Sequence, residues 1–299
     1  MWFIYAIITL LLWSIADLFY KKGAKEDDKY SHLKTGIMVG LVMGIHATLY
    51  LITQGVNFQI IDIIKYLPVS FFYIASMIIG YKGLRYIELS ISSPIQNSSG
   101  IVASLLLFII FKDELSTLDM IGIVIIGIGV ILLSYLEGKK EAKETPKGKL
   151  GKKVIFLAIF FPLIYCLLDG AGTFLDAIYL DKLELINEDA ALIAYEYTFF
   201  IYGLISYIYL RFLKKEKMKI YEEKEKLMAA IFETLGQMFY VYAMAANSTL
   251  SAPVVASYSI MSVLLARLLL KEKLRMKEYV AICTVLLGIV ILGVSEGLA

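Results

Sequence analysis

The sequence predicts an all-α integral membrane protein with ten transmembrane helices arranged as two inverted five-helix repeats. Three observations predict this fold class. The 299 residues are 59% hydrophobic with a mean hydropathy of +0.74, more apolar surface than a soluble fold of this length can bury. Apolar segments long enough to cross a bilayer recur along the chain, and basic and charge-poor connections alternate between them. The second half of the chain also repeats motifs of the first.

Each expected span follows from the roughly 20 apolar residues that a helix needs to cross a hydrocarbon core about 30 Å thick. Long continuous apolar runs favour helices over a membrane barrel, whose strands are short and alternating. The first run has no basic start and no small-residue cleavage site, so we expect a retained helix rather than a signal peptide. The expected helices span residues 2–20, 35–53, 66–87, 89–111, 116–136, 154–178, 190–211, 227–247, 249–270 and 276–295.

Basic residues are concentrated in alternate connections of the expected bundle. Of the 29 Lys and Arg residues, 25 lie in five connections. The positive-inside rule places these connections in the cytoplasm and both termini outside, as in a multi-pass protein of the plasma membrane. The five basic connections are residues 21–34, 82–88, 137–153, 211–226 and 271–277.

An internal repeat appears when Pro94 is aligned with Pro253, an offset of 159 residues. A proline, a small polar patch, an apolar run and a Lys-acid-x-Leu ending then recur in order, and Gly129 falls on Gly288. We expect a first repeat at residues 1–136, a flexible cytoplasmic linker at 137–152 and a second repeat at 153–299.

Five helices per repeat place the second copy in the membrane upside down. The charges of matched connections agree, since residues 21–34 hold five basic residues and their counterpart, 179–190, holds one. Inverted repeats are typical of secondary transporters, in which two halves exchange conformations around a central site.

Three motifs resemble the EamA branch of the drug/metabolite transporter superfamily. Phe111-Lys112-Asp113-Glu114-Leu115 and Leu270-Lys271-Glu272-Lys273-Leu274 each precede a glycine-containing helix, and Leu12-Trp13-Ser14 resembles the apolar-Trp-Gly opening of the family with Ser in place of Gly. The resemblance implies ten helices in two repeats around a central cavity, and transport without ATP. It leaves the substrate open, because fold analogy does not settle function.

Acidic residues inside the expected spans are the strongest functional candidates, because an ionisable group in a membrane is costly unless it is paired, protonated or hydrated. Asp169 and Glu233 lie near mid-span, which favours a functional role, whereas Asp17 and Asp176 lie near helix ends, where water or headgroups can solvate them. An interior with many carboxylates and few bases suits a cation or a proton. The acids in spans are Asp17, Asp169, Asp176, Glu196 and Glu233, and the possible basic partners are His46 and Arg267.

Helical spacing gives these acids polar neighbours. Tyr165, Asp169 and Thr173 share one helix face, and Glu233, Gln237 and Tyr240 share another. An aromatic cage built from Trp13, Tyr165 and Tyr258 would contribute about 0.5 to 2 kcal/mol per contact with an ammonium group. The polar cluster at residues 92–99 favours substrate binding or helix packing equally. The candidate substrate-binding residues are Trp13, Gln96, Asn97, Tyr165, Asp169, Glu196, Glu233, Gln237 and Tyr258, and Glu233 and Asp169 are the candidates for proton coupling.

These residues predict a secondary active transporter of a small organic cation or amine-bearing metabolite, coupled to protons. The alternatives are an exporter of amino acids or other neutral metabolites and, from a different class, a non-transporting membrane sensor or assembly partner, which a solid, dry interior would favour. No phosphate loop, paired metal-ligand spacing, nucleophile elbow or nucleic-acid module is visible. We therefore expect no enzyme activity, cofactor, metal or nucleic acid. The expected partners are a small molecule, protons and the bilayer.

Overall fold

The computed structural model describes residues 1–25, 28–83, 99–112, 115–144, 152–269 and 274–298, and every regular element in these residues is a helix. The predicted all-α class is confirmed. Two π-helical turns, Ile178–Lys182 and Tyr209–Leu213, follow α7 and α8, and a 3-10 turn at Ile220–Glu222 precedes α9. The helices are α1 (Trp2–Gly23), α2 (Ser31–Gln54), α3 (Ile60–Gly83), α5 (Ser99–Phe111), α6 (Thr117–Glu144), α7 (Lys152–Ala177), α8 (Glu188–Ile208), α9 (Lys224–Ala256), α10 (Tyr258–Leu269) and α11 (Met276–Leu298).

Seven helical stretches within the described residues are long and apolar enough to cross a membrane. Two further apolar helices, Ser99–Phe111 and Thr117–Leu133, are shorter. The stretch Lys224–Leu269, which comprises α9 and α10, has 46 residues. This is about twice the length that one crossing requires.

The long stretch is interrupted at Asn247, whose φ of −167° and ψ of 93° are not helical. Its side-chain oxygen accepts the backbone N–H of Leu250 at 3.1 Å, so Asn247 caps the helical segment that follows. The break agrees with the predicted boundary between residues 247 and 249. A second break at Ser257, which separates α9 from α10, was not predicted.

Two other helix boundaries differ from the prediction by six residues or more. α3 begins at Ile60, six residues before the predicted start at 66, because Asp62 accepts the backbone N–H of Gln59 at 2.9 Å and so caps the first turn. α6 continues to Glu144, into the predicted linker at 137–152. The part of the predicted helix at 89–111 that precedes Ser99 lies outside the described residues.

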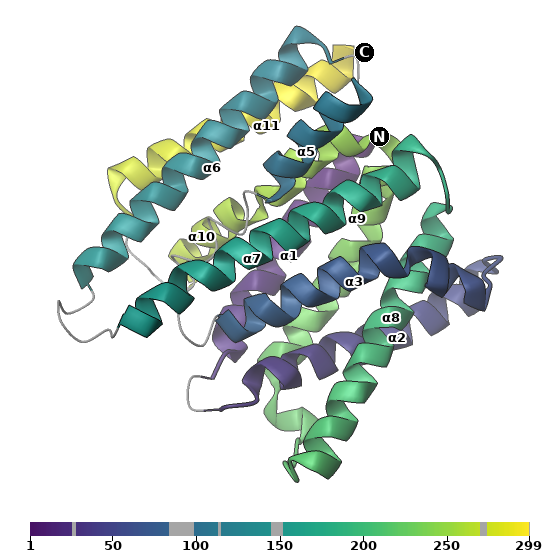
Figure 1. Ribbon diagram of the computed structural model, residues 1–299. Coiled ribbons are helices and arrows are strands. Elements are labelled where there is room, and N and C mark those ends of the chain that lie inside the picture. Colours follow the sequence, from purple (N-terminus) through teal and green to yellow (C-terminus); the bar gives the residue numbers. More distant parts are fainter. Residues whose placement is uncertain (26–27, 84–98, 113–114, 145–151, 270–273, 299) are drawn as a thin grey trace.

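The helices form a bundle in which segments far apart in the sequence lie side by side. α1 packs most extensively against α9, α2 against α8, α3 against α7, and α6 against α11. α6 and α11 form one edge of the bundle and α2 and α8 the opposite edge, with α1, α3, α7 and α9 between them (Figure 1). These four central helices surround an internal cavity.

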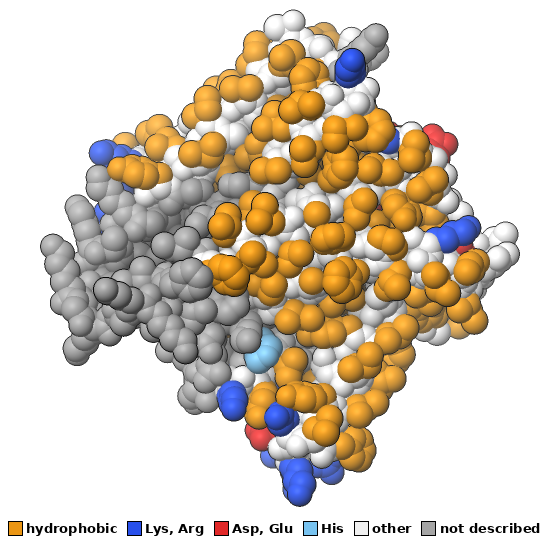
Figure 2. All heavy atoms as spheres, viewed as in Figure 1, with side chains coloured by type: hydrophobic (Ala, Val, Ile, Leu, Met, Phe, Trp, Pro, Cys, Tyr) orange, Lys and Arg blue, Asp and Glu red, His pale blue; other side chains and the backbone are white. Residues whose placement is uncertain are grey.

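Large apolar side chains cover the outside of the bundle. On α6, Val124, Ile128 and Ile131 are 58%, 55% and 61% exposed, whereas Ile126 and Val130 on the opposite face are buried. Apolar side chains cover most of the described surface of the face in Figure 2, and Lys and Arg side chains lie toward its edges. This distribution is that of a surface in contact with lipid rather than water.

The contact between α2 and α8 is made by backbone. A Cβ atom on Gly40 would lie 2.4 Å from the carbonyl oxygen of Phe199 and 3.0 Å from the Cα of Gly203. Gly36 and Gly44, one turn to either side, are similarly crowded. Small residues at this spacing allow two membrane helices to approach closely.

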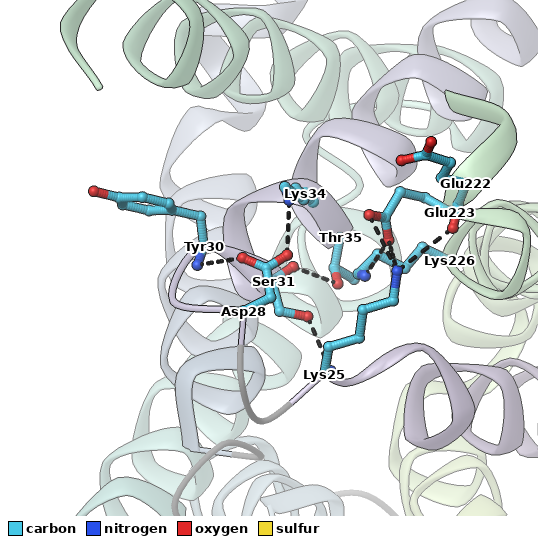
Figure 3. A network of polar contacts seen from close by, with 9 residues as sticks. All are labelled: Lys25, Asp28, Tyr30, Ser31, Lys34, Thr35, Glu222, Glu223 and Lys226. Atoms are coloured by element: carbon cyan, nitrogen blue, oxygen red, sulfur yellow. Dashed lines mark hydrogen bonds and ion pairs between the residues drawn. The ribbon is translucent and has the colours of Figure 1, made fainter. Parts of the chain in front are cut away.

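At one end of the bundle, two basic connections meet in a polar network. The ammonium group of Lys25 lies 3.4 Å from the carboxylate of Glu223, which also pairs with Lys226 (Figure 3). Lys34 donates to Asp28 at 2.7 Å within the same network. The segments at 21–34 and 211–226 therefore lie on the same side of the bundle.

Candidate functional site

A cavity lies at the centre of the bundle, between α1, α3, α5, α7, α8, α9 and α10. Its volume is about 110 Å³. One water needs roughly 10–15 Å³ of such volume, so the cavity has room for several waters or a small organic molecule. Its lining among the described residues is Trp13, Asp17, Tyr20, Tyr73, Met77, Gly80, Ser99, Gly100, Tyr165, Asp169, Thr173, Tyr195, Glu233, Gln237, Tyr240, Ala252, Val255, Ala256 and Tyr258.

Three carboxyl groups line this cavity. Asp17 comes from α1, Asp169 from α7 and Glu233 from α9. None of the described lining residues is Lys, Arg or His. The lining is therefore electronegative, and a low-dielectric wall strengthens its attraction for a cation.

Hydroxyl donors hold the carboxylate of Asp169. The Ser99 hydroxyl donates to its Oδ2 at 2.6 Å. The Ser76 hydroxyl donates to the carbonyl oxygen of Tyr73 at 2.8 Å and lies 3.4 Å from Oδ1 of Asp169. Hydrogen bonds donated to a carboxylate favour its ionised form, and here they act against burial, which favours the neutral form.

Glu233 has a different environment. Its side chain is 8% exposed, and no hydrogen-bond donor is among the described groups that act on its carboxyl group. Its backbone oxygen accepts the indole N–H of Trp13 at 3.2 Å, which fixes the indole beside the carboxyl-bearing turn. Charge interactions with Asp17 and Asp169 act on Glu233. This carboxyl group is thus close to like charges and lacks the donors that Asp169 has.

Aromatic side chains form the rest of the wall. The Trp13 ring stacks on Tyr240 with centroids 5.0 Å apart and meets Tyr258 edge to face at 5.9 Å. The indole fits because residue 236 is glycine, since a Cβ there would lie 2.3 Å from the Trp13 ring. Trp13, Tyr165 and Tyr258, predicted to form a cage, all line the cavity.

The amide of Gln237 lines the cavity one helical turn after Glu233. The residue is 2% exposed, and its side-chain nitrogen has no hydrogen-bond partner within the described part of the chain. A buried amide donor without a partner is costly. It is therefore available to a ligand or to water.

Some predicted site residues lie elsewhere. Glu196 is fully buried between α2 and α8 and pairs with Nδ1 of His46 at 2.8 Å, away from the cavity lining. Asp176 was expected to be solvated at a helix end, and this expectation is wrong, because Asp176 has no exposed surface and accepts the hydroxyl of Tyr66. Gln96 and Asn97 lie outside the described residues.

Sequence reasoning missed the contribution of α3 to the site. The Tyr73 hydroxyl lies 2.6 Å from the hydroxyl of Tyr240 on α9 and donates to the hydroxyl of Thr173 on α7 at 3.1 Å. These contacts join α3 to both helices. Tyr73, Met77 and Gly80 recur at helical spacing and all line the cavity. This spacing is the signal that could have indicated the face.

The fold and the site together define a helical membrane protein with a polar chamber inside its bundle. The chain belongs to the EamA-like transporter family, whose profile matches residues 1–135 and 184–294. One solved crystal structure has a similar fold, with a TM-score of 0.69 over 97% of this chain and 95% of the other chain. The two sequences are only 10% identical, so the likeness is one of fold alone. No curated protein matches the chain.

Proposed function

We propose that the protein is a secondary active transporter that carries a small organic cation or amine-bearing metabolite across the cell membrane by alternating access, coupled to protons. One observation carries the proposal. Asp17, Asp169 and Glu233 place three carboxyl groups in one aromatic-walled cavity that has no basic side chain among its described lining. Carboxylates and aromatic faces are the groups that bind an ammonium ion.

The proposal includes ten membrane crossings in two inverted repeats. The break at Asn247 divides the long α9–α10 stretch into two crossings, and α5 belongs to the fourth. In the two repeats, α1 corresponds to α7 and α3 corresponds to α9. Interchanging the repeats therefore turns the α1–α9 contact into the α3–α7 contact. The α2–α8 and α6–α11 contacts each join a helix to its own counterpart. A two-fold relation between the halves accounts for all four contacts.

Matched capping contacts support the same repeat. Asp119 accepts the backbone N–H of Ser116 at 2.9 Å, and Glu278 accepts that of Arg275 at 2.6 Å. Both pairs are related by the 159-residue offset that aligns Pro94 with Pro253. The same turn therefore begins α6 and α11.

The proposed orientation places the basic connections in the cytoplasm and both termini outside. The contact between Lys25 and Glu223 supports a common side for two basic connections. At the opposite end of α1, the N-terminal amine lies 2.6 Å from Glu296, as an even number of crossings requires. The positive-inside rule then assigns the basic side to the cytoplasm.

Uptake of choline into proteoliposomes tests the proposal. Choline is a fixed cation with no ammonium proton of its own, so any coupled proton must come from the protein. We expect a vesicle interior more acidic than the outside to drive choline uptake, and Glu233→Gln to abolish the response to the pH gradient. Glu222→Gln makes the same chemical change at a surface carboxylate that is 52% exposed, and should leave uptake unchanged. A pH response that survives in Glu233→Gln contradicts coupling at this residue.

The Gln237 amide favours a second candidate, an exporter of amino acids or similar metabolites. Its unused donor suits a substrate that carries a hydrogen-bond acceptor as well as an amine. Competition between choline and a zwitterionic amino acid distinguishes the two. Inhibition of choline binding by the zwitterion but not by tetramethylammonium would favour the second candidate.

A further inference from the structure

We propose that Asp17 and Glu233 share one proton as a carboxyl–carboxylate pair, and that this pair, rather than Asp169, is the proton carrier of the cavity. Its role in transport rests on the proposed function. The existence of the pair does not, because it follows from the contacts of α1 and α9.

The register of α1 against α9 places Asp17 within about one helical turn of Glu233. The hydroxyl of Thr9 donates to the carbonyl oxygen of Gly236 at 3.3 Å, and the Trp13 indole donates to that of Glu233 at 3.2 Å. Nearer the basic end, the rings of Phe19 and Phe232 stack with centroids 5.9 Å apart. Asp17 lies one turn beyond Trp13 on α1, and its side chain lines the same cavity as that of Glu233.

Neither carboxyl group has its hydrogen bonds satisfied. Oδ2 of Asp17 is buried without a partner among the residues that the structure describes. No hydrogen-bond donor is among the described groups that act on the Glu233 carboxyl. Asp17 is also the strongest charge acting on Glu233. Two carboxylates that face each other in a low-dielectric cavity repel, and one shared proton removes a charge and supplies the missing donor.

The groups around the pair do not remove the need for this proton. Ser262 donates to Asp17, and Lys21, one turn further along α1, interacts with it electrostatically. Together they suit a pair that keeps a single negative charge. On the other side Glu233 meets Asp169, a further negative charge, and Tyr258. No basic side chain faces Glu233 from the described cavity lining.

Asp169 differs from the pair in having hydroxyl donors. The hydroxyl of Ser99 donates to it at 2.6 Å and stabilises its charge without a proton. When a cation enters, the shared proton leaves the pair for cavity water, which leaves two carboxylates and Asp169 around the cation. No covalent bond other than O–H is broken, and one positive charge replaces another.

Infrared spectroscopy of the purified protein tests the pair without any ligand. The C=O stretch of a protonated carboxyl group is separate from that of a carboxylate. We expect a protonated-carboxyl band that titrates between about pH 5 and 9, a range typical of buried carboxyl groups. Asp17→Asn and Glu233→Gln should each remove the same band at neutral pH, since either change removes one of the two groups that share the proton. Asp169→Asn, a matched change in the same cavity, should retain it.

The outcome separates this inference from the proposed function. If the band persists in Asp17→Asn and is lost only in Glu233→Gln, the proton belongs to Glu233 alone and the sharing is refuted. If neither change affects the band, the pair does not hold a proton. Loss of the band in both variants, with wild-type protein that fails to move choline, would uphold the pair and overturn the transport proposal.

Discussion

The charge on Asp169 is positioned by two helices other than its own. Ser99 lies at the start of α5 and Ser76 on α3, so the carboxylate is held where three helices meet the cavity. A side chain fixed in this way keeps its orientation whether or not a ligand is present. Such preorganisation lowers the cost of binding a cation.

Asp169→Asn should therefore weaken choline binding by about 10- to 100-fold, because a hydrogen-bonded or charge contact to an ionised group contributes roughly 1.5–3 kcal/mol. Ser99→Ala should weaken it less, since the charge remains while its main donor is lost. Isothermal titration calorimetry on purified protein measures both. Equal affinity in wild type and Asp169→Asn would remove Asp169 from the site.

Spacing along single helices predicted much of this site. Asp169 with Tyr165, and Glu233 with Gln237, follow from residues three or four apart on one helix face, and the structure brings both pairs to the cavity. Asp17 was expected to be solvated near a helix end, but it lines the cavity. Distance from a helix end does not tell whether neighbouring helices exclude bulk water there. Glu196 was predicted to bind substrate but lies outside the cavity lining, because it pairs with His46 where α2 meets α8.

At the scale of helices, the close contact of α2 with α8 depends on glycine. Gly40→Leu should prevent this packing and strongly reduce the yield and melting temperature of the protein in detergent, because the new side chain would meet the backbone of α8. Gly127→Ala on α6 is the matched control, since a Cβ there meets only Ile101 at 3.8 Å. Comparable melting temperatures in wild type and Gly40→Leu would contradict the contact.

The polar network between the loop before α2 and the start of α9 makes stability depend on pH. Burial raises the pKa of Asp28, but the hydrogen bond and charge of Lys34 outweigh it and hold this pKa below its usual value of 3.8. Stability from this carboxylate is therefore present above the usual pKa and lost as pH falls through the lowered one. The melting temperature of wild type should exceed that of Asp28→Asn at neutral pH, and the difference should shrink as the pH falls below the usual pKa of 3.8. A difference that persists in acid would exclude the ion pair as its cause.

Helix existence was easier to predict than helix ends. Apolar length alone predicted the apolar helices that the structure describes, because a bilayer imposes a minimum length on each crossing. The early start of α3 depends on one capping carboxylate, Asp62, and the second break at Ser257 interrupts a run that remains apolar on both sides. Local contacts of single residues decide such boundaries, and hydropathy does not register them.

For the whole molecule, the important feature is that the central helices pair across the two halves of the chain. α1 and α3 from the first half pack against α9 and α7 from the second, and the cavity lies between them. Movement of one half against the other would therefore change access to the same carboxyl groups from either end. The inverted repeat, the electronegative cavity and proton exchange are thus parts of one proposed mechanism.

The most direct test of this account is a comparison of choline with its uncharged carbon isostere, in which carbon replaces the nitrogen. The two have the same shape, so the difference in their affinity for purified protein, measured by calorimetry, reports the response of the cavity to positive charge. The account predicts that choline binds at least about tenfold more tightly, because each ionic contact contributes more than 1 kcal/mol in such a site. Equal affinity for the isostere, or no binding of choline, would contradict it.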